Sequence, residues 1–253
     1  MKGALVTGAG LRIGRALALA LAADGFFVFV HYKDSAAGAR ETVATIKDAG
    51  GKAMAVRADL ASARQAEGLV AKCRARGVRL TCLVNSASLF KLDRAPTATA
   101  ADFDLHMAIN LRAPLLLAQA LARQLPADET GLVVNVLDQK LYNLNPDFLT
   151  YTLSKIGLQG LTTLLAQSFA PRLRVAGIAP GLTLRSGSQT DARFAEQHAA
   201  NPLGVGVTVE DLVRALRFIV ATPSYTGDTI VVDSGEHLTG RPRDIAFDLK
   251  KKK

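Results

Sequence analysis

Tryptophan is absent from the 253 residues, only two are cysteine, and aromatic residues make up 6% of the chain. The cysteines, Cys73 and Cys82, form no CxxC pair, and the four histidines are far apart and show no HExxH pattern. Disulfide frameworks and zinc sites depend on such spacings, so we expect no metal and two buried, reduced thiols. Few aromatic rings accompany the scattered lysine and arginine residues, which argues against a nucleic-acid partner.

Long apolar runs are also missing from the sequence. The longest, residues 16–30, is interrupted by Asp24 and Gly25, whereas a membrane-spanning helix needs roughly 18–20 consecutive apolar residues. The opening MKGALVTG leads directly into a core-like strand and shows no signal-peptide pattern. We therefore expect a cytoplasmic protein without a membrane partner.

Basic residues outnumber acidic ones, and the formal net charge is +9 at pH 7. Four of these charges belong to the lysines at 250–253, which leaves +5 for the rest of the chain. We expect this lysine tail to be disordered and solvated, with a weak polyanion tether as the alternative. A basic balance would equally suit a phosphorylated cofactor.

Apolar runs alternate with helical patterns along the whole chain. The runs are rich in Val, Ile and Leu, which is typical of strands buried on both faces of a parallel sheet. This alternation predicts a doubly wound α/β fold: one Rossmann-like domain over residues 1–249, with about seven parallel strands between two helical layers. We expect strands near 5–6, 26–32, 52–60, 80–87, 132–138, 174–180 and 228–235, and helices over 13–23, 36–49, 63–76, 101–124, 149–170 and 209–221.

Ligands of such a fold collect beyond the carboxyl ends of its strands. After the first strand, Gly8 and Gly10 allow a tight turn, and Gly14 allows close helix packing while the helix amino end faces a pyrophosphate. The spacing is not the usual GxGxxG, so a nucleotide site and a merely tight turn both fit it. Arg12 stands inside this turn, where a bulky side chain is unexpected.

A second pattern, DQKLYNLNPDFLTYTLSK, places Asp138 thirteen residues before Tyr151 and Lys155 four residues after it. Residues i and i+4 of a helix share a face, so we expect the Lys155 ammonium beside the Tyr151 phenol. A nearby positive charge favours the phenolate, and we expect it to lower the pKa of Tyr151 from about 10. Tyr151 is thus a candidate proton donor, although any helix can carry YxxxK by chance.

Several short motifs occur in an order that resembles the short-chain dehydrogenase/reductase family. They are TGAGLRIG at 7–14, ADL at 58–60, NSAS at 85–88, Asn110, YTLSK at 151–155 and PGLT at 180–183, and the resemblance covers about residues 3–240. It implies an NAD(P)-dependent oxidoreductase with a single Rossmann-like domain, usually a homotetramer or a dimer.

Two departures from the common family pattern point to one branch of the family. Arg12 stands where most members have the middle glycine of TGxxxGxG, and Asp138 stands where they have serine. Both substitutions are similar to the pteridine reductase and dihydromonapterin reductase branch, which the chain also resembles at HYKDSAAGA, residues 31–39, and at Phe90. The resemblance implies that Phe90 stacks on a pterin and that Arg12 reaches cofactor phosphate and pterin. A structural salt bridge is the alternative for Arg12.

The chemistry of Asp138 supports the same branch independently. A serine hydroxyl donates a hydrogen bond to the developing oxyanion of a ketone, whereas an ionised carboxylate only accepts and would repel that oxygen. The carboxylate can accept from ring or amino N–H groups, or from the Tyr151 hydroxyl. We therefore expect reduction of a C=N bond in a nitrogen heterocycle.

The loop after the second strand bears on the choice of cofactor. An acid at its start would hold the ribose hydroxyls of NAD, whereas a 2′-phosphate needs basic or hydroxyl donors. The loop begins with His31, Tyr32 and Lys33, and Ser35 follows, which favours NADPH. Asp34 is the complication, because similar pteridine reductases tend to have arginine there, and Lys33 would then supply the charge.

Together these expectations describe an NADPH-dependent reductase of a pterin-type C=N bond, whose substrate is dihydromonapterin, dihydrobiopterin, dihydrofolate or none of these. Tyr151 would donate the proton and Asp138 would orient the substrate or the tyrosine, while the family implies that Lys155 holds the nicotinamide ribose and Asn110 completes a water relay. The expected substrate contacts are Arg12, Ser88, Phe90, Asp138 and Tyr151. The expected cofactor contacts are Gly8, Arg12, Ile13, Gly14, His31, Tyr32, Lys33, Ser35, Asp59, Leu60, Asn85, Ser86, Ala87, Tyr151, Lys155, Pro180, Gly181 and Thr183.

Three further expectations complete this interpretation. Residues 184–207 are expected to form a mobile substrate lid. One alternative function is reduction of a carbonyl such as a 3-oxoacyl thioester, which requires Asp138 to be protonated or idle. Another is a noncatalytic NADPH-binding regulatory module, which the complete pair of Tyr151 and Lys155 disfavours.

Overall fold

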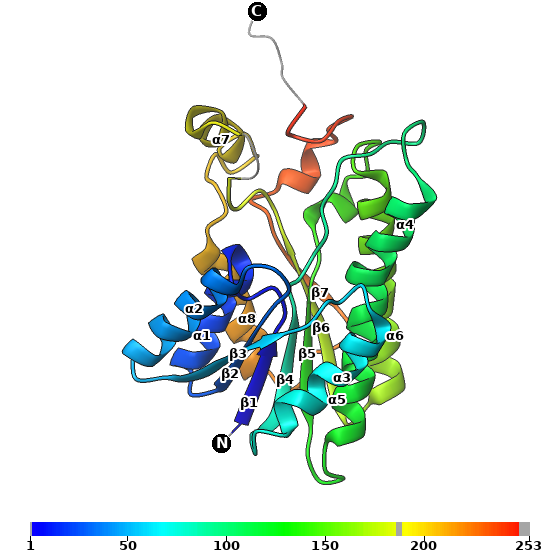
Figure 1. The fold of residues 1–253 in the computed structure, drawn as a ribbon. Coiled ribbons are helices and arrows are strands. Elements are labelled where there is room, and N and C mark those ends of the chain that lie inside the picture. Colours follow the sequence, from blue (N-terminus) through cyan, green and yellow to red (C-terminus); the bar gives the residue numbers. More distant parts are fainter. Residues whose placement is uncertain (1, 186–188, 248–253) are drawn as a thin grey trace, which may run out of the picture.

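A computed structural model describes residues 2–185 and 189–247 of the chain (Figure 1). Seven parallel strands form one sheet in the order β3-β2-β1-β4-β5-β6-β7. The strands are β1 (Lys2–Val6), β2 (Phe27–Tyr32), β3 (Lys52–Arg57), β4 (Arg79–Asn85), β5 (Gly131–Val136), β6 (Leu173–Pro180) and β7 (Thr229–Val232). The helices are α1 (Arg12–Ala23), α2 (Ala36–Asp48), α3 (Ala63–Arg74), α4 (Ala100–Met107), α5 (Ala113–Gln124), α6 (Leu149–Phe169), α7 (Asp191–His198) and α8 (Val209–Ala221). A π-helical turn η1 (Ala108–Arg112) joins α4 to α5, and η2 (Gln139–Tyr142) and η3 (Glu236–Thr239) are 3-10 turns.

Helices cover both faces of the sheet, which explains why the sequences of the strands are continuous apolar runs. Successive residues of a strand point to opposite faces. In β1, the fully buried Leu5 belongs to the core beneath α3, α5 and α6, whereas the fully buried Val6 belongs to the core beneath α1, α2 and α8. Figure 1 shows these helical layers on either side of the sheet.

The predicted fold is confirmed: the chain is a single Rossmann-like α/β domain with a seven-stranded parallel sheet. The two thiols, Cys73 and Cys82, are free and buried, as expected. The sequence did not predict α7, which lies inside the segment expected to be a lid. Residues 186–188 of that segment and the lysine tail lie outside the described residues, and the mobility of the segment stays a prediction.

The continuous helical stretch Ala100–Gln124 is long and apolar enough to cross a membrane by length and composition alone. Its most apolar window has a mean hydropathy of 1.2, and half of that window is buried inside the protein. Leu117 and Leu121 are fully buried in the core beneath α5. The helices that cover a sheet have this same character, so the hydropathy of the stretch matches its place in the core.

Candidate active site

The loops after β1 and β4 meet where the strand order reverses, which is the usual ligand position in a doubly wound sheet. The Thr7 hydroxyl accepts hydrogen bonds from the backbone N–H groups of Ser86 and Ala87, both at 3.0 Å. Gly8 has a φ of +65°, and a Cβ at this position would lie 2.9 Å from the Cα of Ala87. The glycine turn and the NSAS segment are therefore in contact, and only glycine permits their close approach.

Arg12 begins α1 with a φ of +55°, in the left-handed region that glycine adopts most readily. Such a conformation costs on the order of 1–3 kcal/mol and is typical of functional positions. The guanidinium donates to the carbonyl oxygens of Arg185 at 2.6 Å and Leu184 at 3.3 Å. Within the described residues, Arg12 thus joins the glycine turn to the loop after β6 and forms no salt bridge, and its contact with a cofactor phosphate stays a prediction.

His31 lies in β2, is buried, and has a protein partner at each ring nitrogen. Nδ1 lies 3.2 Å from the backbone nitrogen of Gly8, and Nε2 lies 3.1 Å from the carbonyl oxygen of Ala58. Because Gly8 donates and Ala58 accepts, the neutral ring carries its proton on Nε2. Burial lowers the pKa of His31 to about 4, and the Ala58 hydrogen bond and the Asp59 charge oppose this only partly. His31 supports the turn in its neutral form, and its direct contact with a cofactor stays a prediction.

Replacing His31 with glutamine is expected to make the protein less sensitive to acid. The unfolded chain protonates this histidine near pH 6.5, whereas the folded protein does so only near pH 4, so stability is lost as the pH falls between these values. Since one pKa unit is worth about 1.4 kcal/mol, the loss amounts to about 3 kcal/mol. Denaturant unfolding of both proteins from neutral pH down to pH 4 measures it.

Glu236 changes the stability of the protein with pH in the opposite direction, and its effect must be separated from that of His31. Burial raises the pKa of Glu236 from 4.5 to about 7, so its contribution to stability is lost as the pH rises between these values. Both proteins retain Glu236, and the difference between their unfolding free energies therefore isolates His31. Equal acid sensitivity of the two proteins would contradict the role assigned to His31.

A cavity of about 400 Å³ beyond β2 and β3 is lined by Lys33, Arg57, Asp59 and Gln65. The Lys33 ammonium lies 3.2 Å from an Asp59 carboxylate oxygen, and the Arg57 Nε donates to the Lys33 carbonyl oxygen at 3.1 Å. Sequence reasoning proposed Lys33 and Asp59 as site residues but missed Arg57. Arg57 ends β3 in register with Tyr32 of β2, and its one sequence signal is its position directly before the ADL motif.

Tyr151, Asp138 and Lys155 come together between the end of β5 and the first turns of α6. The Tyr151 hydroxyl donates to Asp138 Oδ2 at 2.6 Å, and the Lys140 backbone N–H donates to Oδ1 at 2.8 Å. Lys155 Nζ donates to the carbonyl oxygen of Val136 at 2.7 Å and lies 5.7 Å from the centre of the Tyr151 ring. Tyr151 and Lys155 are buried, and Asp138 as a whole residue is partly exposed.

The effect predicted for Lys155 on Tyr151 is wrong. Burial raises the pKa of Tyr151 well above its ordinary value of 10, and the Asp138 charge and hydrogen bond raise it further. Lys155 directs its ammonium to the Val136 carbonyl oxygen, and burial lowers the pKa of this lysine to about 8, with the Asp138 charge opposing. The carboxylate is therefore the neighbour that controls the phenol, and it keeps the phenol protonated.

The pKa of Asp138 is also raised, because burial outweighs the hydrogen bonds from Tyr151 and the Lys140 backbone and the charge of Lys155. Two groups that share one short hydrogen bond titrate as a pair. The pair can thus hold a proton beside a bound molecule at a pH where an ordinary exposed carboxyl has lost its own.

Asn110 lies in the π-helical turn η1, a kind of turn that is frequent at functional sites. Its Nδ2 donates to the Leu89 carbonyl oxygen at 3.0 Å and to Ser154 Oγ at 2.9 Å, and its Oδ1 accepts from the Leu89 backbone at 2.8 Å. Asn110 therefore ties the loop after β4 to α6. Its part in a water relay stays a prediction.

Phe90 follows Leu89, the residue that Asn110 binds, and its ring lies against the ring of Tyr151. Its half-exposed ring meets Tyr151 edge-on, with centroids 4.7 Å apart and an interplanar angle of 85°. It also stacks on Phe148, at 4.1 Å and 17°. Phe148 is buried and was missed by sequence reasoning. An exposed aromatic ring beside a protonated phenol offers a stacking surface for a planar ligand.

The remaining predicted residues lie along the same edge of the sheet. Asn85 Nδ2 donates to Asn135 Oδ1 at 2.8 Å, while its own Oδ1 is buried without a hydrogen-bond partner among the described residues. Gly181 N–H donates to the Val232 carbonyl oxygen at 2.9 Å, and Thr183 Oγ1 donates to the Gly181 carbonyl oxygen at 2.9 Å. Ile13 and Leu60 pack into the two cores, Tyr32 ends β2, Ser35 precedes α2, Ser88 is exposed in the loop after β4, and Pro180 ends β6.

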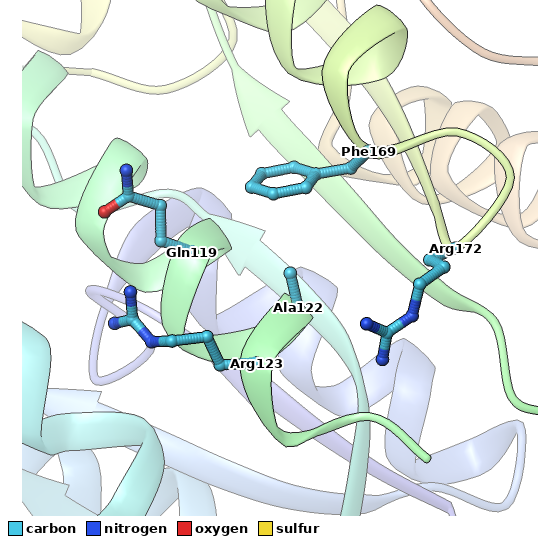
Figure 2. Close-up of a pocket in the computed structure, with 5 residues that line it drawn as sticks. All are labelled: Gln119, Ala122, Arg123, Phe169 and Arg172. Carbon is cyan, nitrogen blue, oxygen red and sulfur yellow. The ribbon is translucent and has the colours of Figure 1, made fainter. Parts of the chain in front are cut away.

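A second cavity, of about 320 Å³, lies near the amino ends of β5 and β6 and thus away from these residues. Figure 2 shows it between side chains of α5 and the end of α6, lined by Gln119, Ala122, Arg123, Phe169 and Arg172. In residues 2–185 and 189–247, no group of three or more His, Cys, Asp or Glu residues is placed to hold a metal ion. The candidate active site is therefore the carboxyl edge of the sheet.

Known proteins resemble the chain over nearly its whole length. The family model of the short chain dehydrogenases matches residues 2–197. The 3-oxoacyl-[acyl-carrier-protein] reductase of Synechocystis sp. is 30% identical over 92% of this chain and 95% of that protein. The structure of FolM alternative dihydrofolate reductase 1 from Brucella canis, complexed with NADP, is 40% identical with a TM-score of 0.89, over 93% of this chain and 94% of that one. LugOII, a promiscuous reductase that catalyses keto-reduction at C1 during lugdunomycin biosynthesis, is 32% identical with a TM-score of 0.84, over 94% and 98%.

A doubly wound sheet with a glycine turn at its carboxyl edge defines a protein of the Rossmann-like class, and the similar proteins are oxidoreductases. The match to the family model and the extent of the similarities identify the family of the chain within this class. The chain belongs to the short-chain dehydrogenase family, which confirms the resemblance of its motifs.

Proposed function

We propose that this oxidoreductase uses NADPH to reduce a C=N bond in a pterin-type ring. The observation that carries the proposal is the 2.6 Å hydrogen bond from the Tyr151 hydroxyl to Asp138, a carboxylate that stands where most members of the family have serine. The similarity to a dihydrofolate reductase of this fold supports it.

The residues at the carboxyl edge fit a dinucleotide cofactor. A Cβ on Gly14 would lie 2.4 Å from the Gly8 carbonyl oxygen, so α1 starts directly on the glycine turn. Leu11 caps α1 without a hydrogen-bonding side chain, which leaves the first N–H groups of the helix available to a pyrophosphate. The NADP complex of the similar FolM protein supports the same choice of cofactor. When bound, NADPH would supply the hydride.

The chain's own residues then supply and direct the proton. The Tyr151 hydroxyl donates its proton to the substrate nitrogen, which becomes basic as the neighbouring carbon is reduced. Burial and Asp138 hold the pKa of Tyr151 high, so the phenol is in its protonated form at neutral pH. Asp138 accepts from N–H groups of the substrate ring with the lone pairs that Tyr151 and Lys140 leave free.

Phe90 favours a planar substrate. Its ring is half exposed, is fixed by stacking on Phe148, and meets Tyr151 at its edge. A flat heteroaromatic ring stacked on Phe90 would lie beside the phenol and the carboxylate together, whereas a flexible acyl chain gains little from a single aromatic face. Arg12, at the start of α1, would contact cofactor phosphate and substrate as the family resemblance implies.

Ketone reduction is the second candidate, and one observation favours it. Burial raises the pKa of Asp138, and a protonated carboxyl could donate to a carbonyl oxygen as serine does. The similar 3-oxoacyl reductase and keto-reductase also point in this direction.

A substrate panel separates the two candidates. We expect the enzyme to consume NADPH with dihydrobiopterin, dihydromonapterin or dihydrofolate, and to act at least tenfold less efficiently, by kcat/KM, on an acetoacetyl thioester; a tenfold preference corresponds to about 1.4 kcal/mol. Efficient reduction of the thioester without reduction of any of these rings would overturn the proposal in favour of the second candidate. Tight NADPH binding with no turnover of either class would indicate the noncatalytic module.

Replacing Arg57 with alanine is expected to weaken NADPH and not NADH. A 2′-phosphate in the cavity of Lys33 and Arg57 would gain charge-assisted hydrogen bonds worth about 1.5–3 kcal/mol each, so KM for NADPH should rise roughly 10- to 100-fold. Steady-state kinetics with both cofactors measure the ratio, and Arg40→Ala, an exposed arginine of α2, is the matched control. An equal rise of both KM values would show that Arg57 does not distinguish NADPH from NADH by the 2′-phosphate.

A further inference from the structure

Residues 241–247, called here the C-terminal strap, return to the active-site edge and bind the segment before α6. Asp147 in that segment is fully buried. Its Oδ2 accepts from Arg243 Nε at 2.7 Å and from the Asp244 backbone at 3.0 Å, and its Oδ1 accepts from Arg243 Nη2 at 2.8 Å and Arg94 Nε at 2.7 Å. Although burial opposes ionisation, the hydrogen bonds from Arg243, the Asp244 backbone and Arg94 hold the pKa of Asp147 far below its ordinary range. The two-point contact between Arg243 and Asp147 is a fixed attachment of the strap.

Phe247, at the end of the strap, adds its ring to the cluster of aromatic side chains at the active site. The guanidinium carbons of Arg94 and Arg243 lie 5.4 Å and 5.5 Å from the centre of its ring. Its centroid is 6.0 Å from that of Phe148. Since Phe148 stacks on Phe90, and Phe90 meets the tyrosine, three rings connect the strap to Tyr151.

Phe148 itself is held in an unusual backbone conformation. Its φ of +58° lies in the left-handed region, which bulky residues rarely adopt. Asp147 and its arginine partners fix the chain directly before it. Two residues after it, the Thr150 N–H donates to Asp93 Oδ1 at 3.1 Å. Phe148 therefore depends on attachments on both sides to face Phe90.

A second attachment ties the strap to the loop that carries the catalytic carboxylate. Lys140 Nζ lies 3.1 Å from Asp244 Oδ2 and is almost fully buried. The backbone N–H of the same Lys140 donates to Asp138. The strap thus contacts both segments that shape the substrate side of the site.

We infer that the C-terminal strap sets the substrate-binding face, and that Arg243 is a positioning residue that acts through Asp147 and Phe148 on Phe90. The inference deepens the proposed function, on which its choice of a planar ring as substrate rests. Without the strap, Phe148 loses one of the attachments that hold its backbone, and Phe90 loses its stacking partner. Binding of a planar substrate then suffers, while the distant cofactor cavity at Lys33 and Arg57 does not.

The test compares Arg243→Ala with Arg217→Ala in the full-length protein. Arg217 is a matched control, because it also contacts one aspartate, Asp24, through Nε and Nη2, at 3.0 Å and 2.9 Å, but on α8. We expect Arg243→Ala to raise KM for dihydrobiopterin on the order of tenfold, with KM for NADPH unchanged within about twofold and kcat less affected than KM. Arg217→Ala should change none of these values. An unchanged KM for dihydrobiopterin, or an equal rise for substrate and cofactor, would overturn the inference.

Hydrogen exchange supplies a readout that needs no substrate. In Arg243→Ala, the amides of Thr150 and Thr152, which donate to Asp93 and to the Phe148 carbonyl oxygen, should exchange faster than in the parent protein. Loss of protection confined to residues 241–247 would overturn the inference. If the parent protein reduces no dihydropterin, the proposed function fails, and this exchange experiment still decides whether the strap holds Phe148. Phe247→Ala, which leaves the ion pairs in place, should show the same changes to a smaller degree and replaces Arg243→Ala if that variant does not fold.

Discussion

Asp138→Ser is expected to lower kcat/KM for a dihydropterin by about 10²–10³-fold and to raise that for a 3-oxoacyl thioester. The carboxylate accepts from the Tyr151 hydroxyl at 2.6 Å and keeps the pKa of the phenol high. A serine hydroxyl has one oxygen in place of two and no negative charge to attract ring N–H groups, but it can donate to a carbonyl oxygen. The expected magnitude is that of one positioned polar group in a reacting site. Steady-state kinetics with both substrates measure the two changes.

Asp138→Asn is the control for this experiment. Asparagine keeps the shape of the side chain and one acceptor oxygen but has no charge, so it separates the negative charge from mere hydrogen bonding. We expect it to lie between the parent and the serine variant with the dihydropterin. Unimpaired reduction of the dihydropterin by Asp138→Ser would contradict the role of the aspartate.

Tyr151→Phe is expected to lower kcat for any substrate of the enzyme by about 10²–10⁴-fold, which is the contribution of a positioned general acid. The variant keeps the ring that Phe90 contacts and loses only the hydroxyl that donates to Asp138. NADPH affinity should change far less than kcat, because the cavity lined by Lys33 lies beyond β2, three strands along the sheet from β5. Single-turnover kinetics and a cofactor titration measure these effects.

Tyr142→Phe is the matched control for the tyrosine variant. Tyr142 is exposed, and its hydroxyl accepts from Gln159, so its loss should leave kcat within about twofold. Near-normal turnover by Tyr151→Phe would show that the proton comes from elsewhere, with the raised pKa of Asp138 making the carboxyl the first candidate.

The fold could be predicted because its signals are local. Each strand is an apolar run and each helix has a helical period, and the right-handed βαβ rule limits how they connect. The positions of Gly8, Tyr151 and Lys155 followed from the same reasoning, since loops after parallel strands meet at one edge. Asp138, thirteen residues before the tyrosine, reaches it from the position directly before the 3-10 turn η2, which lies between β5 and α6.

The features that sequence reasoning missed depend on contacts between distant segments. Arg57 reaches the cofactor cavity through its register with β2, and register is not visible in a single strand. The left-handed Phe148 is held by Asp147, whose partner Arg243 is 96 residues further along the chain. A left-handed phenylalanine and a strap of this kind have no local pattern, so only the tertiary structure shows them.

The incorrect expectation for Lys155 has the same origin. The i, i+4 spacing places the lysine on the face of Tyr151, but it does not determine where the ammonium points. In the structure the Val136 carbonyl oxygen accepts from Nζ, and the carboxylate is hydrogen-bonded to the phenol instead. The direction of the pKa shift is therefore set by Asp138, in agreement with its importance in the proposed function.

Competition between a dihydropterin and an acetoacetyl thioester in a single reaction tests the central claim most directly. With the two substrates at equal concentration and NADPH limiting, the ratio of the two products gives the ratio of the two kcat/KM values without any assumption about active-site concentration. If a carboxylate beside the tyrosine selects a C=N bond, the reduced pterin should predominate at least tenfold with the parent enzyme, and the preference should reverse with Asp138→Ser. A parent enzyme that forms mainly the hydroxyacyl thioester would contradict the account.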